Sequence, residues 1–229
     1  MTKTALILGA GEGLSASFAR LLAREGMKLG LAARRPEKLA ALCEATGAAA
    51  FGCDVATVDQ VARLFGEVDE RLGALDLVLY NPSFRTRGPL VELDPADVEK
   101  SLMISAYGGF LVGQQAARRM LDQGGGAIFF TGASASVKGY PLSAPFAMGK
   151  FALRGLAQSM ARELAPRNIH VAHFVIDGGI RSAARQVPPD RPDSLLDPDA
   201  IAETYLQIFK QPRSAWTWEV ELRPWVEAF

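Results

Sequence analysis

The stretch PFAMGKFALR, residues 145–154, places Lys150 four residues after the aromatic ring of Phe146. On a helix, residues at this spacing lie on the same face. A tyrosine hydroxyl beside such a lysine has a lowered pKa and can exchange a proton near neutral pH. Phenylalanine carries no such proton, so this pair can position a ligand but cannot supply an acid.

A glycine-rich turn near the N-terminus could bind phosphate. The apolar run TALIL, residues 4–8, leads into GAGEGLS, residues 9–15, and then into a helical pattern. Glycines let the backbone turn sharply there, so that amide groups approach a pyrophosphate at the positive end of the helix. Such turns also occur without nucleotides. The candidate binding residues are Gly9, Gly11, Glu12, Gly13 and Leu14.

The elements that must position these residues alternate along the chain, since short β-rich runs are followed by stretches of helical period. We expect strands at residues 4–8, 29–33, 49–53, 75–80, 127–131, 170–176 and 216–222, and helices at 14–25, 37–45, 58–71, 95–121, 145–165 and 198–209. This alternation predicts one α/β domain, residues 1–229. Its core is a Rossmann-type, doubly wound, parallel seven-stranded sheet with helices on both faces and ligands at the carboxyl ends of the strands.

The composition argues against several other classes of protein. Lys and Arg total 25 and Asp and Glu total 25, so no excess of basic charge suggests a nucleic-acid or membrane partner. Two cysteines and two histidines without metal-ligand spacing indicate neither a disulfide framework nor a metal site. The apolar N-terminal run is too short for a signal peptide or a membrane span. We therefore expect a cytoplasmic protein that binds a small molecule.

Several motifs together resemble the short-chain dehydrogenase/reductase family over nearly the whole chain, in order and spacing. They are Gly9 and Gly13, CDV at 53–55, YNPS at 80–83, AIFFTGAS at 127–134, Lys150, and VIDGGIRS at 175–182. The resemblance implies hydride transfer with NAD(P)(H), and a homodimer or homotetramer. It also implies cofactor contacts from Asp54, Val55, Asn81, Lys150, Gly178 and Ile180. Asp54 could instead cap a turn, and Asn81 could be a turn residue.

The catalytic positions implied by this resemblance are altered. The family uses Asn, Ser, Tyr and Lys, and here Lys150 keeps the lysine position while Phe146 takes the tyrosine position. Ala133 stands at the serine position with Ser134 beside it, and Ser105 stands at the asparagine position. Tyr140 could supply a substitute phenol. The candidate catalytic residues are therefore Lys150, Ser134, Tyr140 and Ser105. Alternatively, Ser134 satisfies local backbone groups and Tyr140 only lines a pocket.

The end of the second predicted strand bears on the choice of cofactor. An NAD site usually has an acidic residue there to bind the ribose 2′-hydroxyl, whereas this chain has Ala33 followed by Arg34 and Arg35. Guanidinium groups suit a 2′-phosphate, so we expect NADP(H). Glu12 in the phosphate loop would repel that phosphate if it faced inward, and NAD(H) stays possible. Alternatively, the two arginines lie in a solvated turn.

Two functions fit these residues. The first is an NAD(P)(H)-dependent oxidoreductase with an atypical site that transfers hydride to a small carbonyl, enone, quinone or imine, with residues 178–197 as a substrate lid. The second is a catalytically impaired NADP(H)-binding protein that senses nucleotide or redox state. Phe146 and Ala133 favour the sensor, whereas the family resemblance favours the enzyme.

Overall fold

The fold is built on a single sheet. The computed structural model describes residues 2–227, and in that range seven strands pair in the order β3-β2-β1-β4-β5-β6-β7. Every neighbouring pair is parallel. The strands are β1 (Thr4–Leu8), β2 (Lys28–Ala33), β3 (Ala49–Gly52), β4 (Leu77–Tyr80), β5 (Gly126–Thr131), β6 (Ile169–Ile176) and β7 (Glu219–Leu222).

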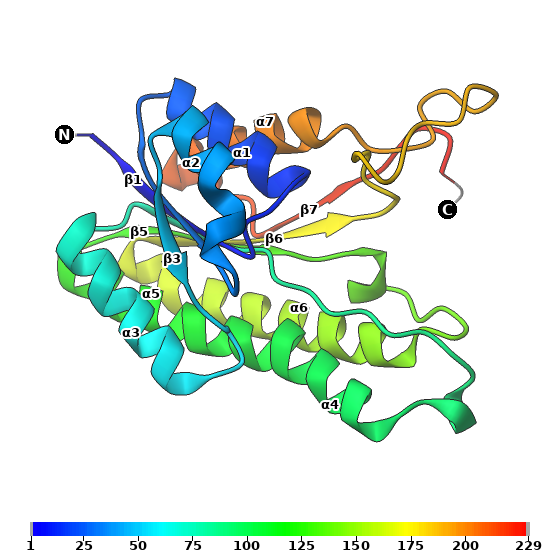
Figure 1. The fold of residues 1–229 in the computed structure, drawn as a ribbon. Coiled ribbons are helices and arrows are strands. Elements are labelled where there is room, and N and C mark those ends of the chain that lie inside the picture. The colour runs from blue at the N-terminus through cyan, green and yellow to red at the C-terminus, as the bar shows by residue number, and fades with distance from the viewer. Residues whose placement is uncertain (1, 228–229) are drawn as a thin grey trace.

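Helices cover both faces of this sheet (Figure 1). They are α1 (Leu14–Arg24), α2 (Ala40–Thr46), α3 (Val58–Arg71), α4 (Pro95–Leu102), α5 (Gly108–Gln123), α6 (Ala144–Leu164) and α7 (Pro198–Phe209). One apolar core joins α1 and α7 to the sheet through residues such as Phe18 and Tyr205, and the other joins α3, α5 and α6 through residues such as Phe65 and Leu153. The predicted doubly wound α/β fold is thus confirmed.

The strand order reverses between β1 and β4, which are neighbours in the sheet although β2 and β3 lie between them in sequence. The connections that leave these two strands run to opposite faces, so a crevice opens at their carboxyl ends. The loops after β1 and β4 therefore meet where a ligand is expected.

Most predicted boundaries agree with the structure to within three residues. Side-chain caps mark the starts of α4 and α7: the side chain of Asp94 accepts a hydrogen bond from the Ala96 amide, and that of Asp197 accepts one from the Asp199 amide. The segment before α2 is a 3₁₀ turn, Pro36–Leu39, that begins with proline. None of the helices in the described range is long and apolar enough to cross a membrane.

The predicted helix over 95–121 is wrong as a single regular helix. A π-helical turn, Met103–Tyr107, separates α4 from α5. In such a turn the i to i−4 hydrogen bonds are interrupted and a carbonyl is freed. The hydroxyl of Tyr80, at the end of β4, donates to the Ile104 carbonyl in this turn. The interruption coincides with a contact to a residue 24 positions earlier in the chain, which helical periodicity does not reveal.

Candidate functional site

The loop between β1 and α1 has the shape that the glycine pattern predicts. Gly9 and Gly13 have φ values of 72° and 85°, a backbone region that favours glycine. A Cβ atom on Gly9 would lie 2.6 Å from the Pro82 nitrogen, so the loop passes directly against the chain after β4. Gly13 immediately precedes α1, whose first amides face the loop as an anion site requires.

Asn81 fastens this loop to β4. Its Nδ2 donates to Ser15 Oγ at 2.7 Å, and Ser15 Oγ donates to the Gly9 carbonyl at 3.1 Å. Two polar side chains, neither of them exposed, therefore hold the turn in its glycine-dependent conformation. The expected role of Asn81 in supporting the cofactor region is compatible with this arrangement and stays a prediction.

A first cavity, which we call the loop cavity, has a volume of about 610 Å³. Its walls include eight of the predicted cofactor residues: Gly9, Gly11, Glu12, Arg34, Arg35, Asp54, Val55 and Asn81. Arg34 and Arg35 are exposed, so their guanidinium groups are free to turn toward a ligand. Asp54 Oδ1 accepts from the Ala56 amide at 3.1 Å, so this carboxylate caps a turn while it lines the cavity.

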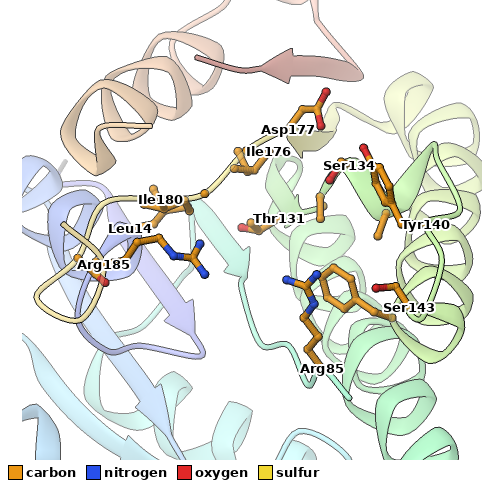
Figure 2. A pocket seen from close by; sticks show the side chains of 18 of the residues that line it. Leu14, Arg85, Thr131, Ser134, Tyr140, Ser143, Ile176, Asp177, Ile180 and Arg185 are labelled. Carbon is orange, nitrogen blue, oxygen red and sulfur yellow. The ribbon is translucent and has the colours of Figure 1, made fainter. Parts of the chain in front are cut away.

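A second cavity adjoins the first, because Glu12 and Asn81 line both. It has a volume of about 970 Å³, and we call it the Phe146 cavity. Its walls come from the phosphate loop, the segment after β4, the end of β5, the start of α6 and the segment after β6 (Figure 2). Leu14, Ser134, Tyr140, Gly178 and Ile180 are among the predicted site residues that line it.

Phe146 lies between two cations in the wall of this cavity. Its ring centroid is 5.9 Å from Lys150 Nζ and 5.1 Å from Arg85 Cζ. Both distances fall in the range of cation–π contacts. The ring stabilises the cations electrostatically and carries no proton to donate, and its place at the family's tyrosine position stays a prediction.

Lys150 lies beneath this ring rather than in the cavity wall. Its side chain is 2% exposed, and Nζ donates to the Thr131 carbonyl at 2.7 Å. Burial lowers the pKa of Lys150 to about 8, because the charged ammonium is removed from water. Lys150 is therefore not a solvent-facing helix residue. Its predicted contact with the cofactor stays a prediction.

The other candidate catalytic residues differ in position. Ser134 is half-buried at the start of the 3₁₀ turn Ser134–Ser136, and it lines the Phe146 cavity. Tyr140 lines the same cavity and is 45% exposed. Ser105 lies in the π-helical turn, is fully buried, and packs under Gly149 of α6 outside the residues lining either cavity. The structure thus brings Ser134 and Tyr140 together and leaves Ser105 apart.

Ser143 and Arg85 are site residues that the sequence analysis missed. Ser143 precedes α6 as its N-cap, yet its side chain makes no capping hydrogen bond. It is 2% exposed, lines the Phe146 cavity, and its Oγ has no hydrogen-bond partner within residues 2–227. The position of Ser143, three residues before Phe146, could have identified it from the sequence. Arg85 lies in an irregular segment after β4, where no periodic pattern of residues indicates which side chains face the site.

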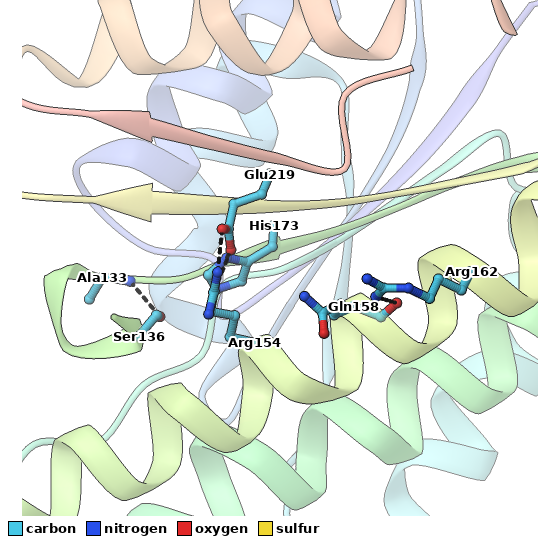
Figure 3. Close-up of polar contacts among 7 residues, drawn as sticks. All are labelled: Ala133, Ser136, Arg154, Gln158, Arg162, His173 and Glu219. Carbon is cyan, nitrogen blue, oxygen red and sulfur yellow. Dashed lines mark hydrogen bonds and ion pairs between the residues drawn. The ribbon is translucent and has the colours of Figure 1, made fainter. Parts of the chain in front are cut away.

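A polar network behind β5 and β6 supports the 132–136 segment (Figure 3). Ser136 Oγ accepts from the Ala133 amide at 3.1 Å. His173 Nδ1 lies 3.0 Å from Glu219 Oε2, and the same carboxylate binds the Arg154 guanidinium of α6 at 2.6 Å. Burial lowers the pKa of His173 to about 4, an effect that Glu219 only partly offsets. The imidazole is therefore neutral at physiological pH, and it packs against Gly132, where a Cβ would meet its ring.

Comparisons with known proteins agree with this geometry. A family model described as short chain dehydrogenase matches residues 3–188. The chain is 28% identical over 223 residues to carbonyl reductase family member 4 of Xenopus tropicalis, covering 93% of each protein. A short-chain dehydrogenase structure from Rhodopseudomonas palustris is 38% identical with a TM-score of 0.84, covering 97% of this chain and 99% of that one. An alcohol dehydrogenase from the archaeon Thermococcus sibiricus, complexed with 5-hydroxy-NADP, is 24% identical with a TM-score of 0.88, covering 100% and 99%.

Proposed function

We propose that this chain uses NADP(H) to reduce a small conjugated carbonyl, quinone or imine. The chain belongs to the short-chain dehydrogenase/reductase family of NAD(P)-dependent oxidoreductases, and this membership is the basis of the proposal. The observation that carries this choice of substrate is Phe146, which stands above the buried Lys150 in the wall of a cavity that adjoins the phosphate loop. The site has the walls for a substrate and lacks a phenolic acid at this position.

The residues present suit a dinucleotide. The loop from Gly9 to Gly13 is open to an anion at the start of α1. A side chain at Gly9 would clash with the Pro82 backbone. Arg34 and Arg35 support NADP(H) over NAD(H), since they are exposed in the loop cavity and carry no carboxylate partner among the ion pairs of the described chain. When bound, NADPH supplies the hydride for the reduction. Lys150 and the loop backbone position the ligands.

The missing acid limits the substrates without forbidding the reaction. General acid catalysis contributes about 10²- to 10⁴-fold, and positioning of the reactants can contribute more. A simple ketone develops an alkoxide that needs a proton at once. A quinone or enone spreads the developing charge over a conjugated system, and an iminium becomes neutral, so these substrates depend less on an acid. Ser134 and Tyr140 line the cavity and are the hydroxyl groups that assist such a substrate.

A second function is supported by the same ring. Phe146 and the enclosed Lys150 leave the cavity without the family's proton donor, as in a protein that binds NADP(H) without turnover and reports nucleotide or redox state. Both functions include nucleotide binding. They differ in whether any substrate oxidises the bound nucleotide.

The test compares the native protein with its Phe146→Tyr variant by the loss of NADPH and NADH absorbance. The substrates are a simple ketone, a diketone, an enone and a quinone. We expect the native protein to reduce the conjugated substrates and to be slow with the ketone, and the variant to gain on the ketone by about 10²-fold or more. Fast reduction of a simple ketone by the native protein would refute the proposal. Activity in the variant alone would favour the sensor.

A further inference from the structure

Four arginines line the Phe146 cavity, and one of them, Arg181, is paired with Asp197. The other three come from two segments that are far apart in sequence. Arg85 and Arg87 follow β4, and Arg185 lies in the segment after β6. Figure 2 shows the guanidinium groups of Arg85 and Arg185 extending from opposite walls toward one another. Like charges that face each other across a cavity destabilise it unless an anion lies between them.

None of these three arginines forms an ion pair with a carboxylate of the described chain. The pKa of the Arg85 guanidinium is lowered by burial and then by the positive charges of Arg87 and Arg185. Phe146 supports Arg85 through its ring face, at 5.1 Å from the ring centroid to Cζ. The guanidinium groups thus repel one another, and the contact that supports Arg85 is with an uncharged ring.

A buried hydroxyl adds a second, independent sign of a ligand. Ser143 is 2% exposed and lines the same cavity, and its Oγ has no hydrogen-bond partner in the part of the chain that the structure describes. A buried hydroxyl left without a partner costs free energy, so such groups are normally satisfied by protein, water or ligand. An oxyanion in the cavity would accept from this hydroxyl.

We infer that the Phe146 cavity binds an oxyanion, the carboxylate or phosphate group of the substrate, through Arg85, Arg185 and Ser143. Guanidinium groups bind both oxyanions in the same forked geometry. The inference rests on the proposed function and narrows it to conjugated substrates that carry an acidic group. Phe146 provides no acid to the substrate. The arginines beside it would instead bind the substrate through its negative charge.

Acidic side chains in the cavity wall leave this positive charge largely uncompensated. Asp177 is already engaged, because its carboxylate binds Lys138 at 3.0 Å and also binds Arg223. Arg181 also lines the cavity, but its charge is already paired with Asp197 at 2.8 Å. Glu12 and Glu227 line the cavity at its edge toward the phosphate loop and the C-terminal segment, and both are exposed.

The test measures binding to the NADP⁺-loaded protein by titration calorimetry, with three probes that share one ring system: naphthoate, naphthyl phosphate and naphthalene methanol. We expect one of the two anions to bind at least about tenfold more tightly than the neutral alcohol. A preference for naphthoate assigns a carboxylate substrate, and a preference for naphthyl phosphate assigns a phosphate ester. Equal binding of all three probes would overturn the inference.

Variants separate this site from the cofactor site. Arg185→Gln and Ser143→Ala should each reduce the preference for the anion by about tenfold and leave the affinity for NADP⁺ unchanged. Arg191→Gln is the matched control, because Arg191 lies in the same segment, is exposed and does not line the cavity. If Arg185→Gln weakened NADP⁺ instead of the probe, Arg185 would belong to the cofactor site and the inference would be wrong.

The readout does not depend on turnover, so the two proposals fail separately. A protein that binds the anion but reduces nothing would refute the enzyme and keep the anion site. A protein that reduces a neutral quinone and shows no preference for an anion would support the enzyme and refute the anion site. If NADP⁺ did not bind, the same titrations on the protein alone would still decide between anion and neutral probe.

Discussion

Replacement of Lys150 by methionine should change how the stability of the protein depends on pH. Nζ of Lys150 is enclosed, with the Thr131 carbonyl as its hydrogen-bond partner at 2.7 Å, and burial lowers its pKa from 10.5 to about 8. Below the pKa of Lys150 in the folded protein, this lysine is protonated in both the folded and the unfolded chain. Folding then includes the full free-energy cost of burying a charged ammonium group. Between the two pKa values the unfolded chain binds more protons, so stability rises with pH.

The magnitude follows from that shift. A difference of about 2.5 pKa units corresponds to about 3 kcal/mol, of which about 2.5 kcal/mol is recovered between about pH 7 and about pH 10. Methionine has a similar length and no charge, so the variant lacks this contribution. It also leaves the Thr131 carbonyl without its donor, which costs about 1–3 kcal/mol at every pH. The pH-dependent part is therefore the part that identifies the buried ammonium.

The assay is urea unfolding of both proteins, followed by tryptophan fluorescence at several pH values across this range. We expect the native protein to gain about 2.5 kcal/mol relative to Lys150→Met on going from about pH 7 to about pH 10. Lys38→Met, which removes an exposed lysine, controls for the change in net charge. A constant difference between native protein and Lys150→Met across the range would refute the reasoning.

Three further results are expected from the same structure. The double variant Arg34→Ala/Arg35→Ala should lose about 10- to 100-fold in affinity for NADPH and little for NADH, measured by nicotinamide fluorescence; parallel losses would count against a 2′-phosphate site. Gly9→Ala should lower the free energy of unfolding by at least about 1–2 kcal/mol and abolish nucleotide binding. The backbone φ of 72° disfavours any residue with a Cβ, and that Cβ would also lie 2.6 Å from the Pro82 nitrogen. Unchanged nucleotide affinity would contradict this account of the loop. Phe151 of α6 is 45% exposed, so Phe151→Glu should lower the mass measured by sedimentation if the predicted homodimer or homotetramer uses this face, and an unchanged oligomer would place the interface elsewhere.

The sequence predicts the sheet well because its signals are local. Each buried strand is a short β-branched or apolar run, and the caps Asp94 and Asp197 mark helix starts through contacts only two residues long. The last strand shows the limit. Its predicted start at residue 216 is three residues early, since Trp216 stacks on His170 of β6 with ring centroids 4.6 Å apart before β7 begins at Glu219. An aromatic residue looks the same in sequence whether it pairs in a sheet or packs beside one.

The candidate site was predictable only where the family's spacing applies. Gly9, Asn81 and the helix that carries Lys150 follow that spacing, and the structure gathers them around adjoining cavities or directly beneath one. Arg85 lies in a segment without regular structure, so only tertiary packing brings it to Phe146. Small residues on α6 look alike in sequence but differ in place: Gly149 and Ala157 pack within the chain, whereas Gly155 is exposed.

The π-helical turn gives this chain one residue more than a continuous α-helix would need to join α4 to α5. A helix rotates by about 100° per residue, so if Met103–Tyr107 closed into regular turns, Gly108 and Gly109 would swing away from Tyr80 and Leu153. A chain shortened by one residue here would keep both flanking helices in place. It would lose the free Ile104 carbonyl that accepts from Tyr80, and with it the contact between this helix and the end of β4, directly before Asn81.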